Sequence, residues 1–131
     1  MAMQITIGSG GRVDAVYKGR TIRTAQDGTE PAPFDLFLAS IGTCTGYYVA
    51  RFCESRGIPT DGIRIEQTRV IDEETRMVER VRVEINLPDD FPERYREALL
   101  RSAALCSVKK HLERPPRVEV ETRIEQTAGR G

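Results

Sequence analysis

Residues 33–57 read PFDLFLASIGTCTGYYVARFCESRG, and the rest of the sequence can be interpreted around them. Proline at position 33 suits the first turn of a helix, because the N–H that it lacks would have no partner there. Gly57 is typical of the position just past a helix C-terminus. We therefore predict one long helix over these residues. It is apolar on nearly every side, with Arg51 as the only charge between Asp35 and Glu54.

The composition excludes several classes of protein. The chain has 131 residues, with 20 Lys and Arg against 20 Asp and Glu, so its net charge is zero and nothing indicates a nucleic-acid partner. The apolar part of the predicted helix is too short and too interrupted to cross a bilayer, and the N-terminus does not resemble a signal peptide. We expect a single domain over residues 1–131, located in the cytoplasm, with no membrane partner.

Segments of alternating polarity predict strands on both sides of this helix. We expect three strands before it, at 4–7, 13–17 and 20–25, and a hairpin after it, with strands at 62–71 and 77–87. A second helix is expected between Pro92 and Pro115, followed by a last strand at 117–124. This order predicts an α+β fold in which the helices pack against antiparallel sheets.

The long apolar helix also bears on the oligomeric state. A helix without a polar face must be covered on all sides, and a few short strands with one further helix can hardly do so. We infer a homodimer in which this helix packs against its copy or is wrapped by the partner's sheet. The alternative is a monomer with the helix sandwiched inside it.

Three cysteines, at positions 44, 53 and 106, include no CxxC pair, which argues against a disulfide scaffold and a zinc ribbon. Cys44 and Cys53 are nine positions apart on a helix that turns about 100° per residue, so they lie on opposite faces. Cys106, on the second predicted helix, is the candidate partner of Cys44. Gly42 and Gly46 would allow the two helices to approach closely. Equally, the glycines could serve packing alone and both cysteines could be core residues.

A reactive Cys44 must be a thiolate, because the thiolate is the nucleophile. Its place several turns inside the helix puts it beyond the helix dipole, and burial would raise its pKa. We therefore expect a cation from elsewhere in the fold. The candidates are Arg12, Arg20 and Arg23, and Asp35 could orient such an arginine.

Two motifs resemble a known family. Residues 33–45, PFDLFLASIGTCT, resemble the first cysteine motif of the OsmC/Ohr family, the osmotically inducible and organic hydroperoxide resistance proteins. Residues 103–108, AALCSV, resemble the second, and the likeness extends over residues 5–124. It implies an intertwined α+β homodimer, with strands and helices in the order β-β-β-α-β-β-α-β, wrapped around two central helices and with active sites at the subunit interface.

The resemblance also implies a thiol peroxidase that acts on hydroperoxides, organic ones preferred. Cys44 would attack the peroxide and become a sulfenic acid, and Cys106 would resolve it as a disulfide. An external dithiol, of the lipoyl type in some members, would reduce the enzyme. An arginine and an acidic residue support the thiolate in the hydroperoxidase branch, and Arg12 and Asp35 are the matching residues here. Neither a metal nor another cofactor is expected.

The chain departs from the family pattern at two places. The glutamate that follows the proline is replaced by Phe34, with Asp35 one position later, and Ser107 stands where many members have proline. These departures favour the wider OsmC-like branch. Alternatives are a non-catalytic dimer that binds a small apolar ligand, a redox-sensing thiol pair, and purely structural cysteines.

Overall fold

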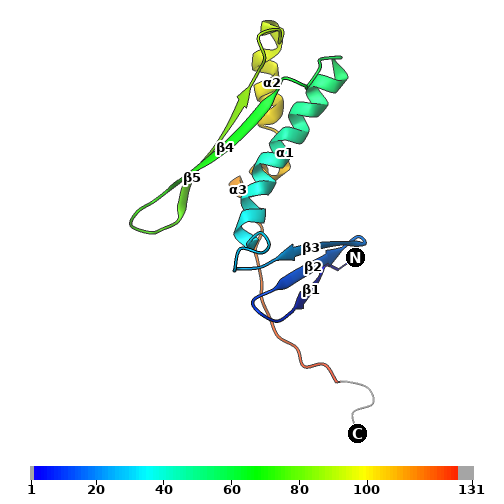
Figure 1. Cartoon of the computed structure of the whole chain (residues 1–131), viewed down its shortest axis with the longest axis vertical. Coiled ribbons are helices and arrows are strands. Elements are labelled where there is room, and N and C mark those ends of the chain that lie inside the picture. The colour runs from blue at the N-terminus through cyan, green and yellow to red at the C-terminus, as the bar shows by residue number, and fades with distance from the viewer. Residues whose placement is uncertain (1, 127–131) are drawn as a thin grey trace.

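The computed structural model describes residues 2–126. The elements follow in the order β1 (Gln4–Ile7), β2 (Val13–Tyr17), β3 (Arg20–Thr24), α1 (Pro33–Ser55), β4 (Arg64–Ile71), β5 (Val78–Asn86), the 3-10 turn η1 (Glu93–Tyr95), α2 (Arg96–Ala103) and α3 (Ser107–Glu113) (Figure 1). None of the helices in this range is long and apolar enough to cross a membrane.

The strands form two separate antiparallel sheets. One is the meander β1-β2-β3, in which Ala15 lies between Ile5 and Ile22 on the neighbouring strands. The other is the hairpin β4-β5, where Ile65 lies opposite Ile85. In Figure 1 the meander lies at the N-terminal end of α1, whereas the hairpin and α2 flank its C-terminal half. The predicted α+β fold, with antiparallel sheets and helices, is confirmed.

Both ends of α1 have clear causes. At its start the Ala32 N–H donates to the Asp35 carboxylate at 3.0 Å, which satisfies a backbone donor that the helix leaves free. At its end Gly57 takes a positive φ of 66°, and the Ile58 N–H returns to the Cys53 carbonyl at 2.9 Å. The predicted long helix is therefore correct at both ends.

The core is small and lies where the C-terminal half of α1 meets α2. Its buried members are Val49, Phe52, Cys53, Phe91, Leu99 and Ala103. Partly buried side chains of the hairpin, among them Ile65 and Ile85, pack against this cluster. The first helix is thus covered over part of its length.

The two glycines of α1 face β4 rather than another helix. A Cβ at Gly42 would lie 2.5 Å from Gln67 Oε1, and one at Gly46 would lie 3.6 Å from Ile65 Cδ1. The Gln67 side chain donates to the Leu38 carbonyl at 2.9 Å, so it lies directly against the helix backbone. The glycines therefore admit the strand, and the expectation that they admit a second helix is wrong.

The second predicted helix is two helices. Its first part ends at Ala103, and Cys106 takes an extended conformation, with φ −48° and ψ 127°, immediately before α3 begins at Ser107. The apolar residues keep their helical spacing across this break, because the residues on both sides of it pack toward α1. Cys106 is the N-cap of this new helix, and its side chain makes no capping hydrogen bond.

The last predicted strand, 117–124, does not form in this chain. The segment is extended but pairs with neither sheet, and Val118, Val120 and Ile124 are 81, 91 and 94% exposed. Figure 1 shows it running past the meander toward the C-terminus. Alternating polarity predicts extended backbone, whereas a strand also needs a hydrogen-bonded partner, and within the described chain this segment has none.

The chain exposes far more surface than its size requires. Its accessible surface is 11140 Å², whereas a compact monomer of this mass exposes roughly 6,900 Å². The excess of roughly 4,000 Å² per chain, or roughly 8,000 Å² for two chains, is at or above the upper end of the total area that obligate dimers bury. The isolated chain therefore does not bury the surface that a self-contained domain of this size would bury.

Candidate active site

The structure brings Cys44 and the start of α3 together. Cys44 Sγ lies 3.7 Å from Ser107 Oγ, although 63 positions separate the two residues. Cys106 directly precedes Ser107 and is fully buried, while Cys44 is half-buried. The two cysteines that the sequence analysis paired therefore lie at one contact between α1 and α3, and both are free thiols.

Their surroundings give the two thiols opposite acidities. Burial raises the pKa of Cys44, but hydrogen-bond donors outweigh it: the Cys106 thiol, the Val108 N–H, and the hydroxyl and N–H of Ser107. The net result is a pKa below the ordinary value. Burial raises the pKa of Cys106, and its hydrogen bond to Cys44 raises it further. Cys44 therefore ionises first, and Cys106 keeps its proton.

Cys53 belongs to the core and not to this site. It is fully buried within the hydrophobic cluster. Burial raises its pKa, and the nearby Arg56 guanidinium opposes that rise only in part. A buried thiol of this kind is inert.

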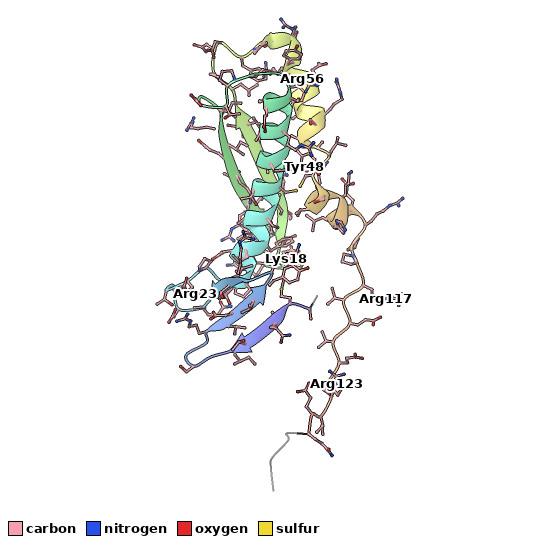
Figure 2. The ribbon with its side chains drawn as sticks, turned by 90° about the vertical axis from the view of Figure 1, so that its right-hand side faces the viewer. Lys18, Arg23, Tyr48, Arg56, Arg117 and Arg123 are labelled. Atoms are coloured by element: carbon pink, nitrogen blue, oxygen red, sulfur yellow. The ribbon has the colours of Figure 1, made fainter. Side chains whose placement is uncertain are left out.

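The predicted supporting residues lie apart from the two thiols. Arg12, in the turn between β1 and β2, pairs with Asp14 at 3.8 Å, and Asp35 binds the Ala32 N–H at the start of α1. Figure 2 shows Arg23 on the meander, near the lower end of α1, whereas Tyr48, one turn beyond Cys44, lies midway along the helix. In the described chain no arginine is among the groups that shift the pKa of Cys44. An arginine partner for Cys44 therefore stays a prediction.

The donors from α3 were not foreseen from the sequence. Ser107 was noted there only as a small neighbour of Cys106 and as a departure from the family pattern. The N-cap of α3 is Cys106, which is not one of the residues favoured at that position, so the sequence carries no capping signal for the break before α3 or for the backbone N–H groups that face Cys44.

An apolar groove of about 1180 Å³ runs along the same side of the molecule. Its walls come from α1, the β4-β5 hairpin, α2 and α3, and include Thr45, next to Cys44 in sequence. Large apolar side chains are exposed there, namely Phe34, Phe37, Met77, Leu100 and Leu112. Such a patch is unusual on the free surface of a monomer and indicates an interaction site.

Comparison with known proteins agrees with this arrangement. Residues 26–121 match the family model described as OsmC-like protein, a range that includes both thiols of the site. No curated protein sequence matches the chain.

Among solved structures, an OsmC-like protein from Mycoplasma pneumoniae has a TM-score of 0.69 at 9% identity and covers 86% of each chain. A protein of Psychrobacter arcticus 273-4, provisionally assigned as osmotic stress induced and detoxification response, has a TM-score of 0.70 at 20% identity, covering 84% of this chain and 86% of its own. The organic hydroperoxide resistance protein OhrB of Bacillus subtilis has a TM-score of 0.51 at 17% identity, covering 83% and 87%. At these identities the likeness shows a shared fold.

Proposed function

Because the chain belongs to the OsmC-like protein family, we propose that it is a thiol-dependent peroxidase that reduces hydroperoxides, organic ones in particular. The observation that carries this proposal is the contact between α1 and α3, where two free thiols meet and Cys44 is the more acidic of the two. The name of the Bacillus subtilis neighbour, organic hydroperoxide resistance protein, supports the same substrate class.

The proposed cycle assigns one role to each thiol. The Cys44 thiolate attacks the outer peroxide oxygen, the O–O bond breaks, and the alcohol leaves with a proton. The resulting Cys44 sulfenic acid is attacked by Cys106, whose proton leaves with the hydroxyl group as water, and a disulfide forms. An external dithiol, such as a lipoyl group, then reduces the disulfide and returns both thiols.

A second copy of the chain is part of this proposal. It would cover the apolar groove, and the excess exposed surface of roughly 4,000 Å² per chain fits an interface of that kind. The second copy could also supply the arginine predicted for Cys44, with Arg12 as the first candidate and Asp35 as its partner. A reducing compartment such as the cytoplasm suits a cycle that starts from two free thiols.

The direct test is consumption of cumene hydroperoxide with dihydrolipoamide as the reductant. We expect turnover by the wild type and loss of it in Cys44→Ser, while Cys53→Ala, which changes the core thiol only, retains it. Mass spectrometry after one equivalent of peroxide should find the loss of two hydrogen atoms at Cys44 and Cys106. Equal consumption by wild type and Cys44→Ser would sink the proposal and favour a non-catalytic, ligand-binding protein.

A further inference from the structure

Ser107 holds a hydroxyl group against the reactive sulfur. It is the first residue of α3, and its Oγ lies 3.7 Å from Cys44 Sγ, within the range of a hydrogen bond to sulfur. Within the described part of the chain, the hydrogen bond recorded for this hydroxyl is the one with Cys44. Among the described residues Cys44 is its one side-chain partner.

We propose that Ser107 is a catalytic residue that stabilises the Cys44 thiolate by donating a hydrogen bond from its hydroxyl group to the sulfur. The inference rests on the proposed function and names a group that the peroxidase cycle above does not use. In the thiol form either atom can donate, whereas a thiolate has no proton, so the serine must be the donor. A hydrogen bond to an ionised acceptor is about twice as strong as one between neutral groups, so the contact favours the thiolate.

No charged side chain of α3 is among the groups that shift the pKa of Cys44. Lys109 is paired with Glu113 at 3.5 Å, and the His111 ring binds the Ser107 carbonyl at 2.7 Å. The titratable group that acts on Cys44 is the Cys106 thiol, which lowers the pKa of Cys44 by donating to it, as the Ser107 hydroxyl does. Both donors act in the same direction, and each can be removed separately.

Four variants separate the hydroxyl from the fold. Ser107→Ala removes the hydroxyl alone, and Ser107→Thr keeps it. Ser107→Pro removes the hydroxyl and the N–H together, and proline fits because it suits the first position of a helix and Cys106 before it is already extended. Ser102→Ala, a serine of α2, is the matched control.

The measurement is the rate of alkylation of Cys44 by iodoacetamide, followed by peptide mass between about pH 5 and pH 10 on the fully reduced protein. For Ser107→Ala we expect the midpoint to rise by about half to one pH unit, which lowers the thiolate fraction below the midpoint about three- to tenfold. For Ser107→Pro we expect the midpoint to rise further. Ser107→Thr and Ser102→Ala should stay at the wild-type midpoint.

The outcome is decided independently of turnover. A serine with a structural role alone would change the melting temperature of Ser107→Ala but leave the alkylation midpoint where it was. A midpoint within about 0.2 pH unit of the wild type in Ser107→Ala overturns the proposal, and a shift in Ser107→Pro alone would then assign the effect to the backbone N–H. If the protein has no peroxidase activity, the midpoint still shifts, so the two proposals fail separately.

Discussion

Cys44 and Cys106 carry the same side chain, and their surroundings alone assign them different roles. Cys44 is half-buried and faces several donors, while Cys106 is fully buried and is itself one of those donors. A hydrogen bond between two thiols stabilises the ionised form of the acceptor and the protonated form of the donor. The same contact therefore lowers one pKa and raises the other.

This asymmetry predicts a pH profile. The thiolate is the nucleophile, and the pKa of Cys44 lies below its ordinary value, so the rate with peroxide should rise with pH and reach half of its maximum at a lower pH than for free cysteine. Single-turnover consumption of cumene hydroperoxide over a pH series would measure it, with free cysteine as the reference. A midpoint at or above that of free cysteine would contradict the environment described for Cys44.

The buried thiol predicts a trapped intermediate. In Cys106→Ser the sulfenic acid on Cys44 has no resolving partner, so it should persist and react with dimedone. Peptide mass spectrometry would locate the adduct. Equal dimedone labelling of the wild type and Cys106→Ser would exclude Cys106 as the resolving residue.

At the level of elements, the contact between α1 and β4 depends on a residue without a side chain. The Gln67 amide lies where a Cβ of Gly42 would be, and it donates to the Leu38 carbonyl. Its Oε1 is buried and without a partner among the described residues. Glycine at position 42 therefore lowers the helix propensity of α1 but allows β4 to approach it closely.

A double-mutant cycle tests this contact. In the wild type, Gly42→Ala gains about 1 kcal/mol of helix propensity but displaces Gln67 and its hydrogen bond, which costs about the same, so we expect little net change in unfolding free energy. In Gln67→Ala the obstruction is gone, and adding Gly42→Ala should stabilise by about 1 kcal/mol. Urea denaturation of the four proteins would show it. Additive effects would mean that Gln67 does not limit the space at Gly42.

The sequence predicted most elements of the fold, and the exceptions have physical causes. Strong periodicity and the glycine at position 57 located α1, and the hairpin followed from its alternation. The break at Cys106 has no glycine or proline to mark it, so the helix period continued through it. The segment 117–124 shows that alternation predicts conformation but not pairing.

The two cysteines of the candidate site could be predicted from the sequence, but the groups that surround Cys44 could not. The motifs at Cys44 and Cys106 indicated two thiols from distant parts of the chain, and the structure places both at one contact. The donors to Cys44 could not be predicted, because they depend on where α3 begins. An arginine was expected because a buried Cys44 needs a group that favours its thiolate. The donors of α3 meet part of this need, since they already favour the thiolate.

For the whole molecule, the decisive quantity is exposed area. An accessible surface of 11140 Å², together with a groove lined by exposed apolar side chains, is more than a stable monomer of this size would keep in water. Folding and association would then be one equilibrium, and stability would depend on protein concentration.

This predicts a dimer that a single charge can disrupt. Sedimentation equilibrium should give twice the monomer mass for the wild type, and the melting temperature should rise with protein concentration. Phe37→Asp, at a groove residue that is 39% exposed, should shift the mass toward the monomer. Val70→Asp, at a residue that is 42% exposed outside the groove, is the matched control. A concentration-independent monomer would refute the dimer.

The contact between α1 and α3 joins two segments that lie far apart in the chain, and this gives oxidation a second consequence. A disulfide from Cys44 to Cys106 would close a loop of roughly sixty residues. The loop lowers the conformational entropy of the unfolded chain, which raises the unfolding free energy by about 4 kcal/mol. Peroxide treatment should therefore raise the melting temperature by roughly 15 °C, and Cys106→Ser should show no such rise. Unchanged melting of the treated wild type would argue against the cross-link. The melting temperature would then report the oxidation state of the protein, because the oxidised form would be the form hardest to unfold.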